Sequence, residues 1–194
     1  MSQLPKKPAL AGKLSHRIMF YSHDTFGLGH LRRSRALAAA LTAGDDTASA
    51  IILTGSPVAG RFTFPERVDH IRLPGVTKLA DGTYVSQTLG LDIDEITALR
   101  SGLIKTAIEK YEPDLLIVDK EPSGFRGELI PSLEFLRDHG EAKTVLGLRD
   151  VLDEPKVLAA EWDRKNAIEA TENFYDEIWV YGDRDIYDPT KGLA

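Results

Sequence analysis

Residues 17–41 read RIMFYSHDTFGLGHLRRSRALAAAL, and this stretch decides the fold. It begins with an apolar run, residues 18–21, that is typical of a buried strand. A turn with Gly27 and Gly29 follows, and leucine and alanine then recur at helical spacing up to Leu41. The order strand, glycine turn, helix predicts backbone N–H groups that face a ligand at the positive end of a helix. That arrangement suits an anion such as a phosphate.

Two side chains in the first turn of this helix are candidates for catalysis and for phosphate binding. His30 and Arg33 are three residues apart, so they share one helix face. The positive helix end disfavours imidazolium, and neutral imidazole is what a general base requires. Arg33 would stabilise the charge of a phosphate. The alternatives are that His30 only bonds water, that Arg33 is a solvated cation, and that Asp24 merely caps the turn.

The common glycine motifs do not match this turn. Arg32 stands where the dinucleotide fingerprint has its third glycine, and no Gly-Lys-Ser/Thr follows as in a phosphate-binding Walker loop. Gly55-Ser56-Pro57 lacks the G-x-S-x-G pattern of nucleophile-based hydrolases. His23 and His30 are not spaced as in a zinc motif, so we expect neither a metal nor a cofactor.

Composition narrows the class of protein. The chain has 194 residues, of which 42% are apolar, and a net charge of −6, which argues against broad nucleic-acid binding. It has no cysteine, so there is no disulfide framework or thiol nucleophile. No apolar run approaches the ~20 residues that span a bilayer. Residues 1–16 lack the apolar region of a signal peptide, so we predict a disordered leader and a cytoplasmic location.

The rest of the chain alternates between strand and helix patterns. Strands are predicted at 49–54, 68–73, 114–119, 142–148 and 177–181, helices at 92–111, 125–136 and 155–174, and a loop at 74–88. This alternation predicts an α/β fold: a Rossmann-like, doubly wound, mostly parallel sheet with helices on both faces. We expect one domain over 17–182, followed by a tail or linker at 183–194.

Polar residues gather where the predicted strands end. In open α/β sheets, ligands bind beyond the carboxyl ends of the strands. The loops there supply the residues that we expect to bind acceptor or phosphate: Asp24, Gly27, Gly29, Arg33, Ser56, Asp119, Glu121 and Arg149. For two of them the sequence leaves another interpretation open, because Asp119 would also serve as a helix cap and Glu121 as a solvated loop charge.

The string HDTFGLGHLRR, residues 23–33, resembles the first loop of glycosyltransferases with two Rossmann-like domains (the GT-B type). The similarity is to the MurG-like family and its UDP-sugar hydrolase relatives, and the matching positions are Gly27, Gly29, His30 and Arg33. The resemblance implies half of a GT-B fold, the N-terminal domain that holds the acceptor. It implies that His30 is the catalytic base and that the glycine turn and Arg33 stabilise the leaving diphosphate.

The implied reaction moves a hexosyl group from a nucleotide sugar to a hydroxyl of a sugar or lipid-linked acceptor. The donor would be held mainly by a second domain that this chain lacks, so we expect the chain alone to be inactive. Two alternatives stay open: a UDP-sugar hydrolase, and a non-catalytic α/β domain that binds a phosphorylated ligand. Leu28 replaces a glycine of the peptidoglycan enzymes, and residues 57–62 only weakly suggest peripheral association with the inner membrane face.

Overall fold

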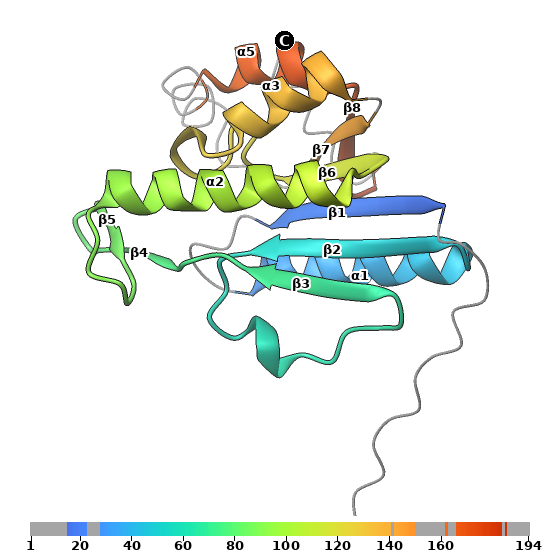
Figure 1. The fold of residues 1–194 in the computed structure, drawn as a ribbon, viewed down its shortest axis with the longest axis horizontal. Coiled ribbons are helices and arrows are strands. Elements are labelled where there is room, and N and C mark those ends of the chain that lie inside the picture. The colour runs from blue at the N-terminus through green and yellow to red at the C-terminus, as the bar shows by residue number, and fades with distance from the viewer. Residues whose placement is uncertain are drawn as a thin grey trace, which may run out of the picture.

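Six parallel strands form the centre of the protein (Figure 1). The computed structural model describes residues 15–22, 28–140, 142–149, 162, 166–183 and 185. The strand order is β3-β2-β1-β6-β7-β8, and every neighbouring pair is parallel. This order confirms the predicted Rossmann-like α/β fold. The strands are β1 (His16–Ser22), β2 (Ala48–Thr54), β3 (Val68–Arg72), β6 (Leu115–Asp119), β7 (Lys143–Arg149) and β8 (Glu177–Tyr181).

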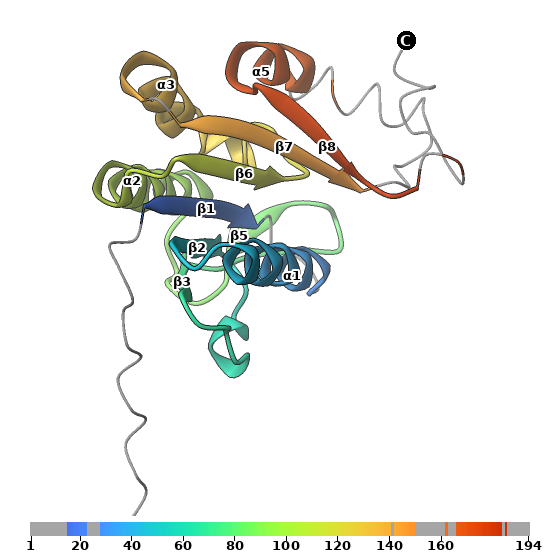
Figure 2. The same ribbon diagram turned by 90° about the vertical axis from the view of Figure 1, so that its right-hand side faces the viewer.

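Strand β1 is apolar throughout its centre because helices cover both faces of the sheet. Ile18 and Phe20 pack in one cluster with α1 (Gly29–Gly44), whereas Met19 and Tyr21 pack in another with α2 (Ile93–Tyr111) and α3 (Ile130–His139). Figure 2 shows α1 on one side of the sheet and α2 and α3 on the other. Phe174, the last residue of α5 (Ala167–Phe174), packs against the same cluster as α3.

Helix α2 confirms the helix predicted at 92–111. Asp92 and Glu95 form a capping box at its start. The buried row includes Ile96, Arg100 and Ile104, spaced four residues apart, whereas Leu99 is 42% exposed. A charged residue, Arg100, therefore lies among the apolar side chains on the core face.

Two predicted segments differ in the structure. The loop predicted at 74–88 contains an antiparallel hairpin of β4 (Val76–Lys78) and β5 (Tyr84–Ser86), whose strands are too short to show a period. The helix predicted at 125–136 is instead a 3₁₀ turn, η2 (Phe125–Gly127), followed by α3. Arg126 and Gly127 have φ of 50° and 82°, and this left-handed backbone cannot continue a helix.

The ends of the predicted domain are only partly described. Strand β1 begins at His16, one residue before the predicted boundary, and residues 1–14 of the expected leader lie outside the described residues. Most of the helix predicted at 155–174 also lies outside them, as does most of the tail at 183–194.

A buried charged network joins β1, α2 and the turn after β6. Arg100 donates from Nε and Nη2 to the two carboxylate oxygens of Glu128, both at 2.6 Å, and the Tyr21 hydroxyl donates to the same carboxylate at 2.7 Å. The Tyr21 oxygen also accepts the N–H of Phe125 at 2.9 Å. Burial, together with the charge of Glu128, raises the pKa of Tyr21 well above its usual value. The phenol therefore stays neutral and acts as a donor.

We predict that Arg100→Met lowers the free energy of unfolding by about 3–5 kcal/mol, because it leaves the Glu128 carboxylate buried without its counter-ion. Urea unfolding measures the change. Arg126→Met is the matched control: it breaks the exposed 2.7 Å pair with Asp94 and should cost less than about 1 kcal/mol. Arg100→Met combined with Glu128→Leu should recover part of the loss. Equal losses for the two single variants would contradict the prediction.

Candidate functional site

The strand order brings two distant parts of the chain together at the carboxyl edge of the sheet. Strands β1 and β6 are neighbours, although the chain leaves β1 toward β2 on the other side. The crevice beyond such a reversal point is where doubly wound sheets bind ligands. Helix α1 begins at Gly29 after β1, and β6 ends at Asp119, so the first turn of α1 lies against the end of β6.

His30, Arg33 and Asp119 form a hydrogen-bonded cluster at this position. His30 Nδ1 lies 2.9 Å from Asp119 Oδ2, and Arg33 Nη2 lies 2.8 Å and 3.0 Å from Asp119 Oδ1 and Oδ2. The Asp119 side chain is only 5% exposed, whereas those of His30 and Arg33 are 21% and 24% exposed. The carboxylate is therefore enclosed, and the two partners that hold it reach the surface.

The cluster determines which nitrogen of His30 carries the proton. An ionised carboxylate only accepts hydrogen bonds, so Nδ1 must be the donor to Asp119. We assign the neutral ring on that basis to the tautomer with its lone pair on Nε2. Arg33 Nη2 also lies 3.3 Å from Nδ1, but two donors face each other there, so that contact is not a hydrogen bond.

This arrangement suits proton transfer. A carboxylate bonded to Nδ1 holds the imidazole in one orientation and stabilises the imidazolium that forms when Nε2 takes a proton. Arg33 donates to both oxygens of Asp119, so its guanidinium balances the charge of the enclosed carboxylate. The sequence left open whether Asp119 only caps a helix. In the structure its carboxylate accepts hydrogen bonds from both His30 and Nη2 of Arg33.

Tyr181, at the end of β8, completes the cluster and was missed by the sequence reasoning. The guanidinium of Arg33 lies 5.2 Å from the centre of the Tyr181 ring. Burial, and the nearby charge of Asp119, raise the pKa of Tyr181 to about 12, while Arg33 opposes the shift. The phenol is therefore neutral at physiological pH. Its oxygen is buried and has no hydrogen-bond partner among the described residues.

The Tyr181 ring reaches Arg33 by crossing β7 at Gly147. A Cβ atom at that position would lie 2.1 Å from the Tyr181 oxygen and 2.7 Å from its Cζ, so no other residue fits there without movement. A single glycine inside an apolar strand often marks such a close approach. Gly147 within TVLGL was therefore a usable signal for Tyr181.

The other predicted residues are placed as follows. Gly29 begins α1, and nothing would obstruct a Cβ there. Ser56 is buried, and its N–H donates to Thr54 Oγ1 at 3.1 Å. Its hydroxyl oxygen is buried without a hydrogen-bond partner among the described residues. Glu121 is buried on the turn after β6, with Oε1 at 3.8 Å from Lys120 Nζ. Arg149 is exposed at the end of β7, paired in register with Tyr181. Asp24 and Gly27 lie outside the described residues.

Two further findings concern only the part of the chain that the structure describes. In those ranges no three histidine or acidic side chains lie together as metal ligands would. Within the same ranges, no helix combines the length and the apolar character that crossing a membrane demands.

Comparisons with known proteins give a similarity in structure but none in sequence. No protein-family model matches the chain, and no curated protein sequence matches it. Among solved structures, the fold is similar to a UGT transferase from Siraitia grosvenorii, determined in complex with UDP, with a TM-score of 0.40 and 15% identity. The match covers 68% of this chain but only 23% of that chain. A similarity of this extent assigns no activity.

We predict that Gly147→Ala destabilises the protein by about 1–3 kcal/mol, because the added methyl group overlaps the Tyr181 ring. Thermal or urea unfolding measures this loss, and Gly147→Ala combined with Tyr181→Ala should remove the overlap and regain part of it. Gly102→Ala in α2 is the control. Its Cβ meets nothing within 4 Å, so higher helix propensity should make that variant slightly more stable. A neutral Gly147→Ala would contradict the close approach.

Proposed function

We propose that the chain is the acceptor-side half of a glycosyltransferase, which moves a hexosyl group from a nucleotide sugar to an acceptor hydroxyl. The observation that carries this proposal is the cluster of His30, Asp119 and Arg33 at the carboxyl edge of the sheet. It supplies an oriented imidazole beside the start of a helix, where direct displacement at a sugar needs a base and a positive potential. The loop resemblance of residues 23–33 supports the same reaction class.

In the proposed reaction, the acceptor oxygen attacks the anomeric carbon of the donor. Its proton passes to Nε2 of His30, and the imidazolium that results is stabilised by Asp119. The bond between the anomeric carbon and the diphosphate oxygen breaks, and that oxygen keeps the electron pair. The first-turn N–H groups of α1 offset the negative charge on the leaving group. Arg33 acts here as a positioning residue, because its Nη2 holds Asp119.

The first test uses the protein expressed from its complete reading frame, assayed with UDP-sugars. We expect His30→Ala to lower kcat by about 10²- to 10⁴-fold with little change in UDP affinity, because it removes only the base. Arg32→Ala is the matched control, an exposed residue in the same helix. Unchanged turnover in His30→Ala would contradict the role of His30. Release of the sugar to water without an acceptor would favour the hydrolase, and UDP binding without turnover would favour a binding domain.

A second test needs no substrate. Arg33 donates to both oxygens of the Asp119 carboxylate, and a guanidinium cannot accept a hydrogen bond. In Asp119→Asn the amide oxygen should therefore face Arg33, and the amide NH₂ should face His30. His30 Nδ1 must then accept, and the ring should switch to the tautomer protonated on Nε2. Nitrogen-15 chemical shifts of the His30 ring in the 194-residue chain report this switch. Unchanged shifts would show that Asp119 does not select the tautomer.

A further inference from the structure

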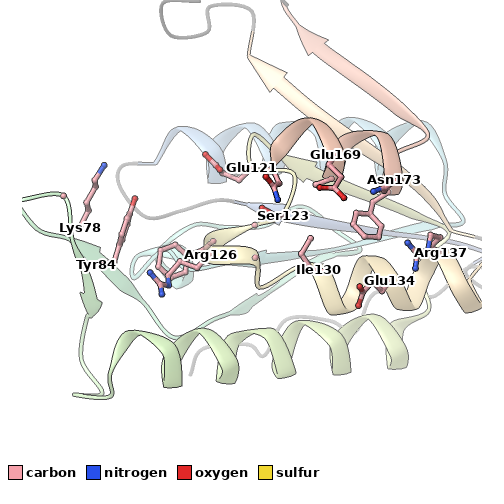
Figure 3. A pocket seen from close by; sticks show the side chains of 17 residues that line it. Lys78, Tyr84, Glu121, Ser123, Arg126, Ile130, Glu134, Arg137, Glu169 and Asn173 are labelled. Carbon is pink, nitrogen blue, oxygen red and sulfur yellow. The ribbon is translucent and has the colours of Figure 1, made fainter. Parts of the chain in front are cut away.

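A cavity of about 1120 Å³ opens next to the turn that follows β6 (Figure 3). It is lined by the β4–β5 hairpin, by residues 123–127, and by α3 and α5. These elements place it on the α3 face of the sheet, whereas α1 with His30 covers the other face. Its volume slightly exceeds the range of about 300–1,000 Å³ that is typical of small-molecule sites, so it can hold a ligand of more than one ring.

The side chains in this cavity combine aromatic rings with acceptors of hydrogen bonds. Tyr84 and Phe125 pack edge to face with their centres 4.9 Å apart, and Figure 3 shows the Tyr84 side chain on the hairpin. Glu134 of α3 and Glu169 of α5 stand on opposite walls, as Figure 3 shows. Asn173 lies beside them on α5. An aromatic face for C–H groups and carboxylates for hydroxyl groups together match a sugar ring.

The charges in the cavity disfavour a phosphorylated ligand. Of the three cations that line the cavity, Arg126 is paired with Asp94 at 2.7 Å and Arg137 with Asp138 at 2.9 Å. The third, Lys78, lies 5.7 Å from the centre of the Tyr84 ring. Glu134 and Glu169 are exposed and form no ion pair with any described residue, so they would repel a phosphate. Hydroxyl groups, which donate hydrogen bonds, suit these carboxylates better.

One wall of the cavity is held in a strained conformation by the protein core. Arg126 in this wall has φ of 50°, and Lys120, just before the lining residue Glu121, has φ of 73°. Both values are unfavourable for residues with a side chain. Phe125 N–H is held by the Tyr21 hydroxyl, and Gly124 has no room for a Cβ, which would lie 2.8 Å from the Leu129 side chain. Such strain clusters at ligand-binding sites, and here it leaves a preformed wall.

The cavity borders the turn that follows Asp119, the last residue of β6. Glu121 lines the cavity, and its N–H donates at 3.0 Å to the carbonyl oxygen of Asp119, the residue that holds His30. We propose that the cavity binds a neutral saccharide of more than one ring. This inference follows from the cavity itself and does not depend on the proposed transfer reaction.

Titration calorimetry of the 194-residue chain with maltotriose, cellotriose and chitotriose tests this inference, with glucose 1-phosphate and UDP as anionic probes. We expect saturable binding of at least one trisaccharide and none of glucose 1-phosphate in the cavity. Tyr84→Ala, and Glu134→Gln combined with Glu169→Gln, should each weaken trisaccharide binding by tenfold or more. Tyr84→Phe keeps the ring and should retain the affinity. Glu172→Gln, an exposed change on the same helix outside the cavity, is the matched control.

The outcomes separate this inference from the proposed function. His30→Ala should bind the trisaccharide normally, because His30 does not line the cavity. If the trisaccharide binds, the cavity variants abolish that binding, and the protein expressed from its complete reading frame transfers no sugar, the saccharide site is retained and the glycosyltransferase is rejected. His30-dependent transfer without any trisaccharide binding overturns the saccharide site alone. Binding of glucose 1-phosphate that Tyr84→Ala abolishes also overturns it.

Discussion

The carboxylate of Glu128 is enclosed in the core, and much of the structure depends on how its charge is satisfied. A buried charge is tolerated only with a counter-ion and hydrogen bonds. Arg100 from α2 and Tyr21 from β1 supply them, and Arg100 Nη1 also donates to the carbonyl oxygen of Pro74 at 2.6 Å. Because the same Tyr21 oxygen holds Phe125, the network fixes the turn after β6 and the approach to the hairpin. These two segments form part of the lining of the cavity that we propose to bind a saccharide, and α3 and α5 supply the rest.

The cluster of His30, Arg33 and Asp119 depends on a second constraint, the enclosure of Asp119 at the end of β6. Its carboxylate is shared by His30 and Arg33, both from the first turns of α1, so one side chain sets the orientation of the imidazole and the position of the cation. The Tyr181 ring, from β8, packs against Arg33 and passes over β7 at Gly147, where a larger residue would overlap the ring. Three strands and one helix thus converge on a few atoms, and the contacts of Asp119 with His30 and Arg33 join residues 89 and 86 positions apart.

Sequence patterns predicted the elements that repeat an obvious period. The apolar run of β1 and the helix predicted at 92–111 both lie where their patterns placed them. The hairpin within 74–88 was missed because its strands have three residues each, too few to show alternation. The start of α3 was misplaced because Arg126 adopts a left-handed conformation that only its tertiary contacts support. Asp24 and Gly27 lie outside the described residues, so their predicted roles remain predictions.

The sequence by itself determined the fold class, since buried parallel strands and amphipathic helices leave periodic patterns that need no knowledge of distant partners. It also marked His30, Arg33 and Asp119 as candidates, through their places beside strand ends. Only the tertiary structure decided that His30 and Arg33 share the carboxylate of Asp119 and that the Tyr181 ring packs against Arg33. It also decided that Arg100 is buried with Glu128. The reason is physical: a charge can be enclosed or exposed in the same local sequence, and the choice depends on partners that only the folded chain brings within a few ångströms.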